Sequence, residues 1–373
     1  MDAAQFDQVA RRVSSGATRR RVVGALSGAA VASLLGAAVG TAKKKPKKKP
    51  YCLNGQTVQA SGKKGKKLRK QGATPGACCV PTCNGTTCGG DGCGGTCGCA
   101  AGSVCNAGAC AKCTVTCSGA PTACGTQLQQ ALFAGGTVVA CPGRYEGAFG
   151  TIQPATLIGA GPGDDPATNT ILVGAGSTVA TLAAVGSYVF KLSGVKLTGA
   201  PARGLYISDN VAAQVSNCTI AGNNGGGILV DGALQLANST VRDNASPDVG
   251  AGIYFYRRGP HTIDNCVISG NVSTAAQTFD GGGGIFTYGN ASVTISGTEI
   301  RGNQAKRGGG IAMETGTVRL DSATSITGNT ATETGGGVAR QGGDFLQNGA
   351  RISGNNSPVS STANCAGVPG GCS

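Results

Sequence analysis

The second half of the chain repeats one pattern of apolar and polar positions. One four-residue unit occurs six times. It consists of an aliphatic residue, any residue, a small or acidic residue and asparagine, and its copies end at Asn223, Asn244, Asn271, Asn303, Asn329 and Asn355. The first five copies are followed by a glycine-rich triplet that runs into Ile228, Ile253, Ile285, Ile311 and Val338. Successive asparagines are 21 to 32 residues apart. Short strands joined by loops of variable length are typical of a solenoid.

The alternation inside each copy predicts a parallel β-helix. Aliphatic residues face inward and their neighbours outward along each short strand. Asparagine tolerates the left-handed backbone of a bend, and its amide can bond the equivalent amide of the next coil. We therefore expect the six asparagines to stack as a structural ladder. The L-x-x-L-x-L pattern of leucine-rich repeats is absent, which excludes that solenoid class.

These units resemble the GGA[ILV]/FxxN repeats of polymorphic outer membrane proteins and the right-handed β-helix domains of the pectin-lyase type. Gly135–Tyr145 (GGTVVACPGRY) resembles the opening coil of such domains, with a capping helix over Gln127–Phe133 before it. The resemblance covers about 113–373. It implies an all-β fold, a right-handed parallel β-helix over 114–373, with Cys124 bonded to Cys141 beside the cap. Such a pattern specifies a fold and leaves activity open.

The N-terminus has the pattern of an export signal. Thr18–Gly24 (TRRRVVG) resembles the twin-arginine signature and leads into Val22–Val39, which carries no charge, and then into Gly40-Thr41-Ala42. This pattern predicts a twin-arginine-type signal peptide over 1–42. A retained membrane anchor is the alternative, because 18 residues reach the lower limit of a span. Both interpretations predict a protein that is secreted or exposed at the cell surface.

The net positive charge is confined to the front of the chain. The formal net charge is +14, which would ordinarily suggest nucleic acid as a partner. Residues 1–75 hold 17 Lys+Arg and 2 Asp+Glu, whereas 76–373 hold 14 and 15. The body is neutral, so no specific nucleic-acid binding is expected. Residues 43–75 are predicted to be a disordered Lys-rich linker, acting as a solvated tether or as an arm that adheres to an anionic wall polymer or membrane surface.

Ten of the 18 cysteines lie within residues 76–113, where there is little else to bury. Such a segment needs cross-links or metal to hold a shape. The Cys110-x-x-Cys113 spacing is half of a zinc site, but thiols in an oxidising compartment pair. We expect a disulfide module of unassigned connectivity, with no metal and no cofactor. Near the C-terminus, Cys365 and Cys372 are expected to close a short loop.

A catalytic site is not evident in the repeats. None of the polygalacturonase motifs that the resemblance implies occurs in order. Asp164-Asp165 falls in a predicted turn, and His261, the only histidine, falls in a predicted exposed loop. No catalytic residues are therefore assigned. A lyase site is the alternative, assembled across coils from Arg257, Arg258, Asp231, Asp264 and Asp280.

Aromatic residues recur at outward positions after the glycine triplets. One column carries Tyr206, Tyr254 and Phe286, and the column two residues further on carries Asp231, Tyr256, Tyr288 and Glu314. Rings flanked by polar groups suit sugar stacking, although β-propensity alone also places aromatics on strands and a loop could cover them. We expect a non-catalytic, monomeric protein that binds polysaccharide or other surface partners along this flank. The alternatives are a polysaccharide lyase or hydrolase of the same fold, and a structural spacer or adhesin stalk.

Overall fold

The structure is a computed structural model, and it divides into two compact units, residues 1–78 and 79–373, each described by itself. The described residues are 48–53, 56–75, 88–90, 96–106, 108–176, 178–182, 187–257, 259–275 and 281–372. The expected signal peptide over 1–42 lies outside them. No helix within these ranges has both the length and the apolar character needed to cross a bilayer.

The described part of the first unit contains a small antiparallel sheet and a basic helix. Its elements are β1 (Lys49–Leu53), β2 (Gln56–Ala60), α2 (Gly62–Lys70) and β3 (Thr74–Pro75), with sheet order β2-β1-β3. Leu68 of α2 packs in a cluster with Tyr51, Ala60 and Ala73. The expectation that the basic run over 63–70 is unstructured was therefore wrong. A single leucine gives this run an apolar contact that offsets the repulsion between its charges.

The second unit begins with cross-linked hairpins. They are β4 (Gly89–Gly90) with β5 (Thr96–Cys97) and β6 (Ser103–Asn106) with β7 (Ala109–Lys112). Disulfides join Cys88 to Cys105 and Cys99 to Cys110. The sulfur atoms of Cys88, Cys99 and Cys110 lie within 4.8 Å of one another, but all three belong to disulfides. This described cluster therefore offers no thiolate to a metal ion.

Helix α3 (Pro121–Ala134) caps the first coil of the solenoid. Leu128 and Leu132 on its inner side join the main core, at 0% and 2% exposure. Disulfides Cys117–Cys124 and Cys113–Cys141 hold the cap and the entering strand. The expected bond between Cys124 and Cys141 was wrong, because each of these residues has a nearer partner on the segment that leads into α3.

Three parallel sheets of nine strands each form the wall of the solenoid, and every coil adds one strand to each sheet. Sheet 1 contains β8 (Gly136–Val139), β11 (Ala155–Ile158), β14 (Tyr188–Ser193), β17 (Val211–Ser216), β20 (Ala233–Ala237), β24 (His261–Asp264), β28 (Ser292–Ser296), β32 (Thr317–Leu320) and β36 (Asp344–Leu346). Sheet 2 contains β9 (Gly143–Gly147), β12 (Thr170–Gly174), β15 (Val195–Thr198), β18 (Thr219–Ala221), β21 (Thr240–Arg242), β25 (Val267–Ser269), β29 (Glu299–Arg301), β33 (Ser325–Thr327) and β37 (Arg351–Ser353).

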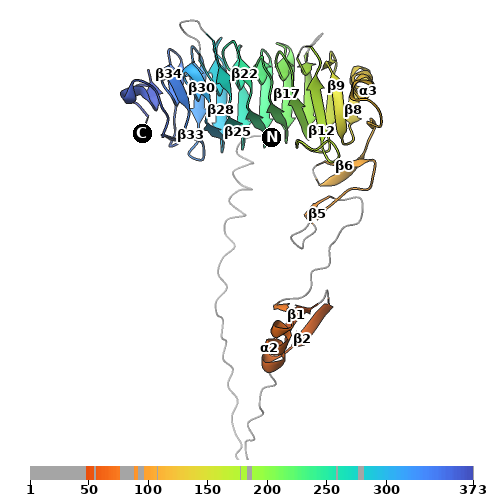
Figure 1. The fold of residues 1–373 in the computed structure, drawn as a ribbon. Coiled ribbons are helices and arrows are strands. Elements are labelled where there is room, and N and C mark those ends of the chain that lie inside the picture. Colours follow the sequence, from red (N-terminus) through yellow and green to blue (C-terminus); the bar gives the residue numbers. More distant parts are fainter. Residues whose placement is uncertain are drawn as a thin grey trace, which may run out of the picture. The chain divides into compact units, whose positions relative to one another are not determined.

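Sheet 3 contains β10 (Phe149–Thr151), β13 (Ala180–Leu182), β16 (Leu205–Ile207), β19 (Ile228–Val230), β23 (Ile253–Phe255), β27 (Ile285–Thr287), β31 (Ile311–Met313), β35 (Val338–Arg340) and β38 (Cys365–Ala366). A four-stranded sheet 4 lies in the loops that join sheets 2 and 3, with β22 (Ala245–Ser246), β26 (Val272–Ser273), β30 (Gln304–Arg307) and β34 (Thr330–Thr334). The coils stack along one axis from α3 to the C-terminal strands (Figure 1). The fold is a parallel β-helix.

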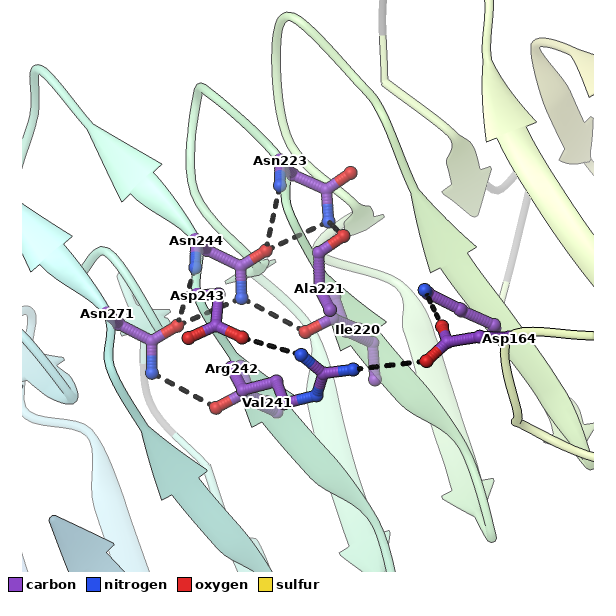
Figure 2. Close-up of polar contacts among 10 residues, drawn as sticks. Asp164, Ile220, Ala221, Asn223, Val241, Arg242, Asp243, Asn244 and Asn271 are labelled. Atoms are coloured by element: carbon purple, nitrogen blue, oxygen red, sulfur yellow. Dashed lines mark hydrogen bonds and ion pairs between the residues drawn. The ribbon is translucent and has the colours of Figure 1, made fainter. Parts of the chain in front are cut away.

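An asparagine ladder lines the turn after sheet 2 (Figure 2). Each side-chain amide nitrogen donates to the amide oxygen of the next coil at 2.9 Å, from Asn223 through Asn244, Asn271, Asn303 and Asn329 to Asn355. Asn355 donates in turn to Asn364 at 3.2 Å, which ends the ladder. These amides are buried and their donors and acceptors are hydrogen-bonded, so they hold successive coils in register.

Four cysteines and one aspartate outside the ladder also have defined places. Cys218 and Cys266 are buried free thiols, and Cys365 is bonded to Cys372 after the short 3-10 helix η1 (Ser360–Thr362). Asp164 reaches from its loop to Lys196 and Arg242 on the outer side of sheet 2, and Arg242 also contacts Asp243 (Figure 2). Asp164 therefore fastens a loop to the solenoid wall.

Candidate functional site

The outer face of sheet 3 carries the two aromatic columns in the expected register. Tyr206, Leu229, Tyr254, Phe286 and Ala312 pair with one another from coil to coil. The second column continues through backbone hydrogen bonds that join Asp231, Tyr256, Tyr288 and Glu314 to the preceding coil. Parallel pairing of constant register brings side chains that lie 23 to 32 residues apart in the sequence into adjacent positions.

Tyr256 and Tyr288 form the exposed part of this face. Their side chains are 39% and 37% exposed, and their rings stack with centroids 5.5 Å apart at an interplanar angle of 23°. The Arg257 guanidinium lies 5.8 Å from the Tyr256 ring centroid and 3.8 Å from an Asp209 carboxylate oxygen. A planar apolar surface is thus bordered by an ion pair that offers hydrogen-bond donors and acceptors.

Phe286 is almost entirely buried, which corrects the expectation of an outward, exposed ring. It is only 3% exposed, in a cluster with Val249, Ala275 and Ala312. Tyr254 is partly buried against it, with ring centroids 5.4 Å apart, and stands edge-on to Tyr256 at 5.7 Å. Val249 and Ala275 come from loops between sheets 2 and 3, and these apolar side chains cover the ring.

A buried arginine holds one of these loops in place. The Arg203 guanidinium donates to the carbonyl oxygens of Gly250 (3.0 Å) and Val249 (3.3 Å) and lies 3.7 Å from Asp248. The same group lies 5.8 Å from the Tyr254 ring centroid. Arg203 therefore positions the covering loop and the ring that supports Tyr256. Nothing in the repeat pattern marks Arg203, because its partners lie 45 to 51 residues later in the chain.

Tyr206 and Asp231 form a separate pair on the N-terminal side of the face. The Tyr206 hydroxyl donates to Asp231 Oδ2 at 2.9 Å. Burial, and then the bond to this carboxylate, raise the pKa of Tyr206 to about 12. The phenol remains protonated at neutral pH and does not serve as a base. Asp231 Oδ1 and Ser208 Oγ are buried and have no hydrogen-bond partner in the described part of the chain.

Glu314 lines a groove on the C-terminal side of the same face. The groove has a volume of about 270 Å³, and Phe286, Met313, Arg340 and Gln341 also line it. The Arg340 Nε donates to the Gly343 carbonyl at 2.7 Å. A concave, partly polar groove next to exposed aromatic rings is suited to an extended polar ligand.

Asp231 and Asp264, two of the residues considered for a lyase site, lie on different sheets, because Asp231 follows β19 of sheet 3 and Asp264 ends β24 of sheet 1. His261 is 1% exposed, which corrects the expectation of an exposed loop residue. Its Nδ1 accepts from the Leu234 amide at 3.4 Å, its Nε2 donates to the Arg257 carbonyl at 3.3 Å, and burial lowers its pKa. Asp264 lies at the end of β24 in sheet 1, and its carboxylate accepts a hydrogen bond from the side-chain amide of Asn265. Residues 258 and 280 lie outside the described ranges.

Comparison with known proteins agrees with this architecture. Residues 181–363 match the family model of the right-handed beta helix region. No curated protein and no solved structure matches the chain significantly. The matched range begins in β13 and extends beyond η1, and the three parallel sheets run through it. The solenoid of this chain is therefore a right-handed parallel β-helix.

Proposed function

We propose that the outer face of sheet 3 binds a glycan and that the protein is a non-catalytic, monomeric β-helix of the cell surface or the secreted fraction. The exposed Tyr256–Tyr288 stack carries this proposal. Exposed apolar side chains that form one contiguous surface mark interaction sites more often than scattered ones do. Sugar rings present an apolar face to such a surface and hydroxyl groups to its polar border.

The arrangement of the face favours a polymer over a single sugar. Coils repeat about every 4.8 Å, so the aromatic pair, Glu314 and the groove beyond it follow one line along the solenoid. Arg257 and Asp209 border the pair at one end, and Arg340 and Gln341 line the groove at the other. A linear polysaccharide running parallel to the solenoid axis would contact each in turn.

Binding is favoured over hydrolysis by the spacing of the two carboxylates in the second column. Asp231 and Glu314 occupy the same column with Tyr256 and Tyr288 between them, which is three coil spacings. That separation is about 14 Å, whereas glycosidase pairs lie roughly 5–9.5 Å apart. Asp231 is also occupied by the Tyr206 hydroxyl. A lyase or hydrolase is therefore the second candidate, and a spacer or adhesin stalk the third.

Export and attachment complete the proposal. The twin-arginine pattern over 18–24 supports passage out of the cytoplasm, and the disulfides of 88–141 support an oxidising compartment. The basic residues of 43–75 support contact with an anionic surface polymer.

A glycan array with a parallel turnover assay tests the proposal. We expect the full chain to bind a polysaccharide, and Tyr256→Ala together with Tyr288→Ala to weaken this binding at least tenfold. Phe133→Ala is the matched control, since Phe133 is 54% exposed on α3, outside the face. Depolymerisation of the bound glycan would favour the enzyme, and neither binding nor turnover across the array would favour the spacer.

A further inference from the structure

Helix α2 presents four lysines on the side opposite to its buried one. Gly65 and Leu68 are the buried residues of the helix, and a Cβ on Gly65 would collide with the Tyr51 ring. The lysine stripe consists of Lys63, Lys66, Lys67 and Lys70. These residues have the i, i+3, i+4, i+7 spacing of one helix face, and all four are exposed.

The stripe has no acidic partner among residues 48–75, where the described part of its unit lies. Residues 48–75 contain eight basic residues and no aspartate or glutamate. Like charges four residues apart cost a helix about 0.2–0.5 kcal/mol per pair. The packing of Leu68 and the Arg69 guanidinium, 5.8 Å from the Tyr51 ring centroid, offset this cost. A bound anion would reduce the repulsion between the lysines, so the helix would be more stable with an anion bound than without one.

The rest of the unit favours an acidic polysaccharide over a membrane or a nucleic acid. Helices that lie on membranes insert an apolar face, but Leu68 faces the core, and no large apolar side chain is exposed among the described residues of 48–75. Single-stranded nucleic acids stack on aromatic side chains, and Tyr51, the one aromatic residue of 48–75, is buried. The stripe spans about 10 Å along the axis, which matches a linear polymer with one carboxylate per sugar.

We propose that the lysine stripe of α2 binds an acidic polysaccharide, with its ammonium groups paired to the carboxylates of successive uronate sugars. This inference rests on the surface attachment proposed above and names its site and its polymer class. The site belongs to the first unit, so it is independent of the Tyr256–Tyr288 stack on the solenoid.

Titration of the full chain with alginate, with neutral dextran as the control polymer, tests the stripe at low and at physiological salt. The stripe variant is K63Q/K67Q/K70Q, and K48Q/K49Q/K64Q removes the same charge from other exposed lysines. We expect binding to alginate but not to dextran, weakened by salt. The stripe variant should lose at least tenfold in affinity and the control variant less than threefold. Circular dichroism establishes that both variants remain folded.

Equal losses in the two variants would mean that only net charge matters, which overturns the inference. Tighter binding to single-stranded DNA or to phosphatidylglycerol vesicles than to alginate at the same salt would overturn the choice of polymer. The Tyr256→Ala/Tyr288→Ala variant separates the two proposals. If this variant no longer binds alginate while the stripe variant still binds it, the solenoid face binds the polymer and the stripe does not.

Discussion

The rings of Tyr256 and Tyr288 stack across neighbouring coils with their centroids 5.5 Å apart, and each residue directly follows one of two strands that pair in parallel. The spacing of coils in a β-helix sets this ring separation, so the stack exists before any ligand arrives. A preformed surface binds without the entropic cost of ordering flexible side chains.

This preformed stack predicts a graded response at Tyr256. Tyr256→Phe keeps the ring and removes only the hydroxyl, so we expect glycan affinity to fall less than threefold. Tyr256→Ala removes the stacking surface and should cost at least tenfold, which is about 1.4 kcal/mol. Calorimetric titration of the two variants with the polysaccharide identified on the array measures the difference. Equal losses would show that the hydroxyl, and not the ring, makes the contact.

Phe286 should affect stability more than specific recognition. Its ring is buried with Val249, Ala275 and Ala312, so Phe286→Ala leaves a cavity and should lower the free energy of unfolding by about 3–5 kcal/mol. Phe286→Leu fills most of the volume and should cost less. Denaturant titration measures both variants. A stable alanine variant with impaired binding would instead place this ring in contact with the ligand.

The asparagine ladder should be intolerant of substitution at its centre. Asn271 accepts from Asn244 and donates to Asn303 and to the Val241 carbonyl. Asn271→Ala leaves these buried groups without hydrogen-bond partners, and each unpaired group costs about 1–3 kcal/mol of folding free energy. The variant should therefore have a lower thermal midpoint, which calorimetry measures. Asn210→Ala, at an exposed position outside the ladder, is the control and should change little. Equal effects at the two positions would contradict the ladder's role.

His261 should make stability depend on pH. Burial lowers its pKa in the folded state below the ordinary value of 6.5, so the unfolded chain takes up a proton first as the pH falls. Stability is therefore constant above about pH 6.5 and declines below it, by up to about 1.4 kcal/mol per pH unit, until the folded pKa is reached. Urea midpoints between pH 5.5 and 7.5 measure this slope. His261→Gln should abolish it, and an unchanged slope would assign it to another group.

A disulfide that closes a longer loop should contribute more to stability, with the logarithm of the loop length. Cys113–Cys141 spans 28 residues and Cys365–Cys372 spans 7. Loop-closure entropy predicts a loss of about 3–4 kcal/mol for Cys113→Ser/Cys141→Ser and of about 2 kcal/mol for Cys365→Ser/Cys372→Ser. Chemical denaturation of both double variants tests the order. A reversed order would mean that the C-terminal loop protects the last coil in the folded state.

The sequence by itself determined the β-helix and its register. Equal spacing from each repeated aliphatic residue to its asparagine predicts parallel coils, and parallel pairing then aligns the columns that contain Tyr254 and Tyr256. Cys218 and Cys266 stand two residues before the repeated Ile220 and Ile268, so the same alternation places both thiols inward, where the structure has them.

Tertiary structure decided what covers each side chain. Phe286 and Tyr288 are both outward-facing in the pattern, yet Val249 and Ala275 bury the first and leave the second exposed. Arg203 and Cys141 likewise find their partners 46 and 28 residues away in the sequence. The basic run is helical because Leu68 packs against Tyr51, Ala60 and Ala73, a contact that its charge pattern does not indicate. Periodicity fixes the direction of a side chain along its own strand. Burial depends on loops whose lengths and paths no periodic pattern specifies.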